Sequence, residues 1–187
     1  MDALEALNTR STAKTFGDTA PSKEDLATVL HAAVRAPDHG RLRPWRFMLV
    51  EGDQRRKFGE LLAASALRRI PGLRAGDLTR ERDKAMRAPL IIILACRIVP
   101  GTKVPAIEQL LATGSAAQNI LLALHTLGYA AAWKTGEAAY DTDVKRALGF
   151  AADDHLVGFI YTGGGMGATF APGKAASVQD AMLDFPG

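Results

Sequence analysis

Residues 35–46 hold the densest group of side chains that could bind a ligand. They read Arg-Ala-Pro-Asp-His-Gly-Arg-Leu-Arg-Pro-Trp-Arg, which sets four arginines against one acid, Asp38. Proline and glycine make this stretch a loop, and loops carry binding residues disproportionately. Arginine binds phosphate and carboxylate groups through paired hydrogen bonds. The loop is therefore a candidate site for an anionic ligand.

Side chains that could act directly as catalysts are scarce elsewhere in the chain. His39 lies in the arginine loop, whereas His31, His125 and His155 fall where structural or surface positions are expected. No serine–histidine–aspartate order or apolar carboxylate pair stands out, and the lone Cys96 offers no zinc-ligand spacing. We expect no catalytic side chain and no metal site, so a bound cofactor would carry the chemistry.

The composition is that of an ordinary globular protein. The 187 residues are 48% hydrophobic and 23% charged, which fits a single domain over 1–187 or one that a partner subunit completes. The net charge is only +3. Basic residues also exceed acids over 55–87, but acids intervene at helical spacing there, so we interpret that region as a solvated helical face.

Nucleic-acid binding is the rival function from another class, because arginines also contact phosphates. Against it, aromatic residues make up only 6% of the chain and no known binding motif is present. We expect no nucleic-acid partner. Asp2 and Glu5 stand where a signal peptide needs basic and apolar residues, and no apolar run is long enough for a bilayer. A cytoplasmic protein with no membrane partner is expected, and a single cysteine fits that reducing compartment.

Hydrophobic spacing predicts helices and strands in an irregular order, without a regular βαβ alternation. Ser22 is placed as the N-cap of the second helix, and Pro37 stops that helix near 35–36. The predicted helices are 1–8, 22–36, 53–69, 76–87, 105–127 and 142–148. The predicted strands are 45–50, 90–98, 129–133 and 156–162. The glycines at 163–167 follow the last strand with no helix after them, so we expect a flexible turn or a strand exit rather than a nucleotide-binding loop.

The helix over 105–127 is apolar around most of its circumference, and small residues fill its middle at 112–117. Such a helix is normally buried, and small residues allow another backbone to approach closely. Burial on two sides in a chain of this length predicts a subunit interface. A central helix within a monomer is the alternative that the sequence leaves open.

Three short motifs stand in the order found in the FMN-dependent nitroreductases. They are Thr-Arg-Ser at 9–11, Ala-Pro and Pro-Trp at 36–37 and 44–45, and Ala-Ala-Trp-Lys-Thr-Gly at 131–136. The chain resembles this family over nearly its whole length, and especially the short bacterial NAD(P)H nitroreductases whose loop reads Arg-Ala-Pro-Asp-His. The resemblance implies an α+β fold with a mixed sheet flanked by helices. It also implies an intertwined homodimer with two FMN sites at the interface.

The resemblance assigns FMN-binding residues in three segments of the chain. It assigns a fourth segment to the nicotinamide cofactor. The positions that match FMN contacts are Thr9, Arg10, Ser11, Arg35, His39, Trp133, Lys134 and Thr135. Of these, Arg35 and His39 would come from the second subunit. The stretch that matches a proposed contact with the nicotinamide cofactor is Ala123, Leu124, His125, Thr126, Leu127 and Gly128.

Three positions depart from the family pattern. Thr9 stands where the family often has a first basic residue, and Arg41 and Arg43 stand where many members have amides. The contacts to the phosphate and the ring are therefore expected to be redistributed. Whether Arg41, Arg43 or Lys174 contacts FMN stays open.

The activity implied by the resemblance is a two-step exchange. NAD(P)H would pass a hydride to the flavin, which would then reduce a nitroaromatic, a quinone or a similar electron-poor acceptor. Enone reduction, dehalogenation and flavin cleavage are alternatives within flavin chemistry, and a non-enzymic flavin-binding module is a further one. Neither the acceptor nor the preference for NADH or NADPH follows from the sequence.

Overall fold

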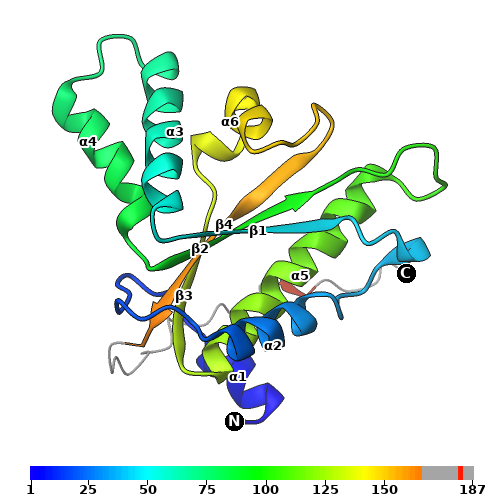
Figure 1. The fold of residues 1–187 in the computed structure, drawn as a ribbon. Helices are drawn as coiled ribbons and strands as arrows, with labels where there is room; N and C mark the ends of the chain where they lie inside the picture. Colours follow the sequence, from blue (N-terminus) through cyan, green and yellow to red (C-terminus); the bar gives the residue numbers. More distant parts are fainter. Residues whose placement is uncertain (166–180, 183–187) are drawn as a thin grey trace.

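The computed structural model describes residues 1–165 and 181–182, and Figure 1 shows their arrangement. The α-helices are α1 (Ala3–Thr9), α2 (Lys23–Ala33), α3 (Gln54–Arg69), α4 (Ala75–Asp83), α5 (Ala106–Thr126) and α6 (Thr142–Ala147). The short 3-10 helices are η1 (His39–Arg41), η2 (Lys84–Met86) and η3 (Glu137–Ala139). The strands are β1 (Trp45–Glu51), β2 (Leu90–Cys96), β3 (Tyr129–Lys134) and β4 (His155–Gly164). The predicted mixture of helices and strands is confirmed.

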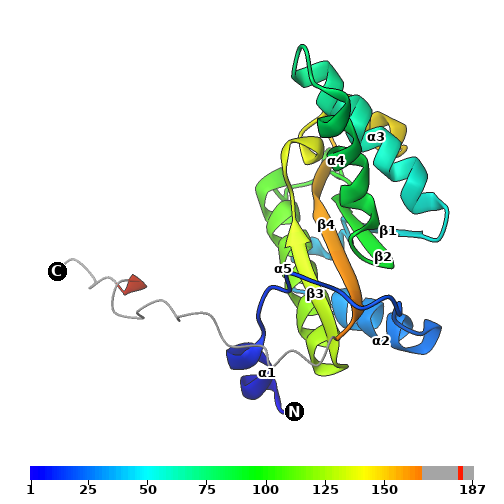
Figure 2. The ribbon, with the colours of Figure 1, turned by 90° about the vertical axis from the view of Figure 1, so that its left-hand side faces the viewer.

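The four described strands form one sheet in the order β1-β2-β4-β3, with β3 beside β4 in Figure 2. Every pairing among them is antiparallel, so the prediction of a mixed sheet is wrong for these strands. The segments that connect the strands explain why the pairing is antiparallel. The helices α3 and α4 return the chain to the end where β1 finished, so Leu90 pairs with Glu51 and β2 runs back along β1.

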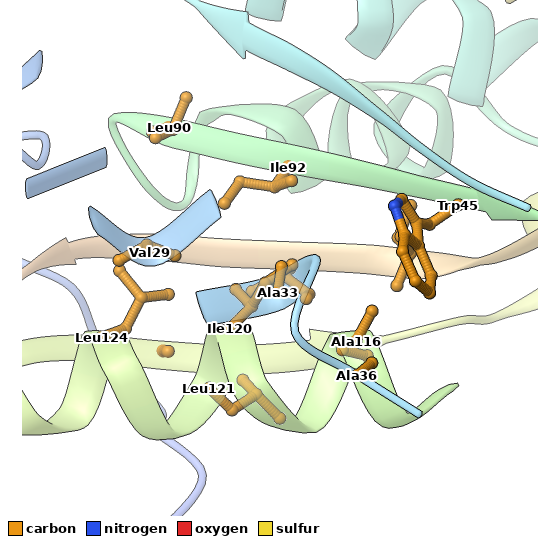
Figure 3. Close-up of a cluster of buried hydrophobic side chains, with 14 of the residues drawn as sticks. Val29, Ala33, Ala36, Trp45, Leu90, Ile92, Ala116, Ile120, Leu121 and Leu124 are labelled. Carbon is orange, nitrogen blue, oxygen red and sulfur yellow. The ribbon is translucent and has the colours of Figure 1, made fainter. Parts of the chain in front are cut away.

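The alternating side chains of β2 build two cores, one on each face of the sheet. Leu90, Ile92 and Leu94 point toward α5 and α2, and this cluster includes Ile120 and Leu124 of α5 (Figure 3). Ile91, Ile93 and Ala95 point the other way, toward α3 and α6. Because both faces are covered, the whole of β2 is apolar and buried, as its unbroken hydrophobic run predicted.

The start of α2 is where the sequence places it. The Ser22 side chain accepts a hydrogen bond from the Asp25 backbone N–H at 3.0 Å. The helix ends at Ala33, slightly before the predicted end near 35–36, and residues 34–36 form a turn and a bend ahead of Pro37. In the described ranges, no helix has the length and apolar character needed to cross a membrane.

The glycines at 163 and 164 are the last residues of β4, so of the two predicted alternatives they form the strand exit and not a turn. The segment after α1 passes so close that only glycine fits. Gly17 donates its N–H to the Gly164 carbonyl at 2.8 Å, and Gly164 donates its own to Thr19 at 2.7 Å. A Cβ on Gly17 would lie 2.9 Å from the Gly164 oxygen. Residues 166 and 167 lie outside the described ranges.

Asp141 joins α6 to α3 and yields a first prediction. Its carboxylate accepts hydrogen bonds from Ser65 at 2.5 Å, from Arg68 at 3.0 Å and from the backbone of Asp143 and Val144. Asp141→Ala should lower the free energy of unfolding by about 2 kcal/mol, through loss of an N-cap and of the buried partner of Ser65. Thermal unfolding measures this, with the half-exposed Asp143→Ala as a control that changes little.

The hydrogen bonds to Asp141 also determine how the stability lost in Asp141→Ala depends on pH. Burial raises the pKa of Asp141, but hydrogen bonds from Ser65 and the backbone, with the Arg68 charge, outweigh it and lower the pKa below its ordinary value. The stabilisation is therefore present above the ordinary aspartate range and is lost as the pH falls through the lowered value. A difference between wild type and Asp141→Ala that grows on acidification would contradict this.

Candidate functional site

A cleft of about 930 Å³ opens beside β3 and β4. It lies on the face of the sheet that α3 and α4 cover, and Figure 2 shows these two helices beside the sheet. Apolar and aromatic side chains of β4 form its floor, and charged side chains of four other segments form its walls. Its lining residues are Thr12, Ala13, Lys14, Phe16, Leu62, Arg69, Ile70, Glu81, Lys84, Arg87, Trp133, Lys134, Thr135, Gly136, Glu137, Ala138, Phe159 and Tyr161. This size suits a small organic ligand.

The segment after α1 reaches the cleft by crossing the edge strand β3. Helix α1 packs against α5 on the other face, and Ala13 then donates its N–H to the Ala131 carbonyl of β3 at 2.9 Å. The side chains of Thr12 and Lys14 arrive at the cleft through this contact. The predicted site residues 9–11 immediately precede it.

Trp133, Lys134 and Thr135 line the cleft, where the sequence predicts cofactor contacts. The Trp133 indole N–H donates to the Val157 carbonyl at 3.1 Å, which fixes the ring at the end of β3. Gly158 lies against that ring with φ +154, and a Cβ there would overlap the indole and sit 2.8 Å from the Lys134 oxygen. The sequence analysis did not single out Gly158, because a glycine in the sequence does not indicate that the Trp133 ring will pack against it.

Gly158→Ala should therefore disturb the site and the fold together. The added methyl group must displace Trp133, and overpacking of this kind lowers stability by roughly 1–3 kcal/mol. We expect a lower melting temperature and altered tryptophan fluorescence. Gly76→Ala in α4 is the matched control, since a Cβ there meets nothing within 4 Å and alanine favours the helix. Equal effects of the two changes would contradict the packing role of Gly158.

Thr9 and Arg10 lie beside the end of α5 rather than on the cleft walls. The Thr9 hydroxyl donates to the Glu5 carbonyl at 2.7 Å and lies 2.9 Å from His125 Nε2. Burial lowers the pKa of His125, and the positive charge of Arg10 lowers it further. Arg10 and Ser11 are each partly buried.

The stretch predicted to contact the nicotinamide cofactor forms the last turn of α5 and its cap. Leu124 and His125 are buried, whereas Thr126, Leu127 and Gly128 are exposed. None of the six residues from Ala123 to Gly128 lines the cleft of the same chain. Their role toward the nicotinamide cofactor stays a prediction.

Arg35 and His39 lie far from the cleft in a single chain. They precede β1, which is at the opposite edge of the sheet from β3. The His39 Nδ1 atom lies 2.5 Å from Glu108 of α5, and neither predicted residue lines the cleft. One copy of the chain therefore divides the predicted cofactor residues between two edges of its sheet.

The arginine loop has an unusual backbone. Arg41 and Arg43 both adopt left-handed conformations, with φ of 54° and 51°. The Asp38 carboxylate holds this shape by accepting the Arg43 N–H at 2.7 Å. Residues other than glycine are strained there, and such strain gathers at functional sites. Lys174, the other uncertain FMN contact, lies outside the described residues.

Positive charge dominates the cleft, with five basic lining residues against Glu81 and Glu137. Lys84 is neutralised by Glu81 at 2.5 Å. The other four have no acidic partner within residues 1–165 and 181–182: Lys14, Arg69, Arg87 and Lys134. Across those same residues, no group of His, Cys, Asp or Glu is arranged to hold a metal ion.

The region 55–87 was predicted to be a solvated helical face, and most of its arginines behave so. Arg56, Arg74 and Arg80 pair with acids three residues away, and Arg82 pairs with Glu60. Arg69 and Arg87 are exposed as well, and together with the half-buried Lys84 they also line the cleft. Helical spacing predicts exposure, but it does not show which exposed basic residues border a cleft.

The family model described as the Nitroreductase family matches residues 7–164, which include the cleft and all eight predicted FMN contacts. The chain belongs to this family. By homology it is an oxidoreductase of the NAD(P)H nitroreductase type. The "Putative NAD(P)H nitroreductase YdjA" of Escherichia coli K12 is 35% identical over 163 residues, 87% of this chain and 88% of that protein. A Haemophilus influenzae relative of the same description is 34% identical over 167 residues, 89% and 90% of the two chains.

Solved structures show the same fold at lower identity. A nitroreductase-like family protein from Bacillus cereus has a TM-score of 0.84 at 23% identity, over 100% of this chain and 97% of that one. A Desulfovibrio desulfuricans protein solved in complex with FMN has a TM-score of 0.73 at 24% identity, over 98% and 96%. These neighbours confirm the α+β nitroreductase fold.

Proposed function

We propose that the cleft binds FMN and that the protein reduces an electron-poor organic acceptor at the expense of NAD(P)H. One observation carries the proposal most directly. Trp133, Lys134 and Thr135, the predicted flavin contacts, lie in one cleft with unpaired cations and an aromatic floor. The FMN complex of the Desulfovibrio neighbour and the NAD(P)H nitroreductase descriptions of the curated relatives agree with this choice.

The residues present fit FMN chemically. The ring system needs apolar contact on one side, which Phe16 and Phe159 supply, and the phosphate needs hydrogen-bonded cations. We assign Arg10 and Ser11 to the phosphate end, and Lys14 and Lys134 to the edge of the ring. When bound, FMN supplies the capacity to accept a hydride from one substrate and pass two electrons to another.

The chain itself contributes electrostatics and exclusion of water. Lys14 and Lys134 place positive charge where an electron-rich ring is held, and this favours the reduced, anionic form of a bound redox group. Buried Phe159 and Tyr161 keep water from the inner side of the cleft. No side chain acts as a nucleophile in this scheme, so protons come from solvent at the open side.

We infer that the working unit is a homodimer, in which a second copy supplies Arg35 and His39. An apolar stripe on α5 offers the surface for this contact: Ile107 is 60% exposed and Leu111 is 63% exposed. Leu4 and Leu7 of α1 are also exposed, and α1 packs against the other end of α5, near His125. Exposed apolar side chains of this kind mark an association site.

Purification without added flavin tests the proposal. The protein should be yellow, with flavin absorption that bleaches when NADPH or NADH is added without oxygen. The colour should return when a nitroaromatic or quinone is supplied, and product analysis then identifies the reaction. Failure to bind FMN even after incubation with an excess would refute the proposal.

A further inference from the structure

His39 is held by a contact between distant segments, although it lies in an exposed loop. Its Nδ1 atom lies 2.5 Å from the carboxylate of Glu108, which is in the first turn of α5 and 69 positions away along the chain. An ionised carboxylate can only accept a hydrogen bond, so Nδ1 carries the proton and Nε2 is the ring nitrogen left for another partner. Because 67% of the His39 side chain is exposed, the ring stays accessible to a ligand.

The backbone beside His39 is fixed to the same helix. Gly40 has φ +73, and a Cβ there would lie 3.1 Å from the side chain of Val104, which lies just before α5. Buried Gln109 ties this segment to α5, because it donates to the Val104 carbonyl at 3.3 Å and accepts from the Val99 N–H at 2.9 Å. The loop and the carboxylate therefore share one support, which orients an imidazole that would otherwise sample several rotamers.

The His39–Glu108 pair borders the apolar stripe on α5 that we assigned to the second copy. Ile107 and Leu111 form this stripe. Leu111 follows Glu108 by three positions, and residues at that spacing are neighbours on a helix surface. A second copy seated on the stripe would therefore meet His39 while Glu108 holds its ring. An exposed pair of this kind adds little to stability, so its larger effect is on the orientation of His39.

We propose that Glu108 is a positioning residue for the FMN site of the second copy. It holds Nδ1 of His39, so that Nε2 is presented to the cofactor and little further side-chain freedom is lost when FMN binds. Glu108 itself does not touch FMN in this scheme. The inference rests on the proposed function, in which His39 reaches the site of the other subunit.

A double-mutant cycle on FMN affinity tests the inference, with titration of the flavin-free proteins as the measurement. The dissociation constant should rise by about 10-fold in Glu108→Ala. It should rise by only about 3-fold in Glu108→Gln, whose amide oxygen still accepts the Nδ1–H. In a His39→Ala background, Glu108→Ala should add less than about 2-fold, whereas a merely structural role would give the same factor in both backgrounds.

Glu24→Ala is the matched control. Glu24 is also an acid in the first turn of a helix, α2, and it forms no ion pair among residues 1–165 and 181–182. This change should leave FMN affinity as it is in the wild type. The melting temperature of Glu108→Ala should stay close to that of the wild type, because the pair with His39 is exposed.

The outcomes separate this inference from the proposed function. If the wild type binds no FMN, the proposed function fails and the inference fails with it. If the wild type binds FMN and Glu108→Ala binds it equally well, or loses as much affinity without His39 as with it, only the inference is overturned. A monomeric Glu108→Ala protein in light scattering would assign Glu108 to the interface and would also overturn it.

Discussion

A Leu111→Glu variant is expected to be monomeric and to lose its bound FMN. Leu111 lies with Ile107 on the apolar stripe of α5, with 63% of its surface exposed in one chain. Dimer formation would bury the new carboxylate on both subunits without a partner, so the dimer dissociation constant should rise by roughly 100-fold or more. Light scattering with parallel flavin absorption measures both effects in one experiment.

A matched control distinguishes the interface from a general effect of added charge. Leu67 on α3 is similarly exposed, at 52%, but lies off the stripe and outside the cleft lining. Leu67→Glu should stay dimeric and keep its flavin. A dimeric, flavin-loaded Leu111→Glu protein would rule out this face as the interface.

Arg10→Ala is expected to weaken FMN binding by about 10-fold to 100-fold, the usual effect of losing a hydrogen bond to a charged group. The fold should persist, because Arg10 follows α1 and forms no ion pair among the described residues. Titration of the flavin-free protein with FMN gives the dissociation constant. Arg56→Ala is the control, since Arg56 is exposed and pairs only with Asp53.

Local patterns predicted much of the fold. The cap at Ser22, the buried strand β2 and the long helix α5 each depend on nearby residues, so spacing and end signals were enough. The antiparallel direction of the sheet was not predicted, because it depends on which strands become neighbours. For the two glycines at 163–164 the sequence left a turn and a strand exit open, because local patterns do not show that the distant Gly17 packs against them.

The candidate site was also predicted only in part, because local motifs are visible in the sequence and contacts between distant segments are not. The motif at 133–135 lies in the cleft, and the adjoining segment 9–11 leads into it. Arg87, after η2, and Tyr161 of β4 also line the cleft and were missed, because they are far apart in sequence. The left-handed backbone conformation at Arg41 and Arg43 was not predicted from the sequence either, since arginine does not usually adopt it.

The central claim is that each FMN site is built from two chains, with Arg10 from one and Arg35 from the other. Heterodimers of an Arg10→Ala chain and an Arg35→Ala chain, purified through two different tags, test it directly. Each mutant homodimer should bind FMN weakly at both sites. The heterodimer should combine both changes in one site and leave the other intact, so half of its sites should bind FMN with wild-type affinity. Weak binding at every heterodimer site, or wild-type binding by the Arg35→Ala homodimer, would contradict the account.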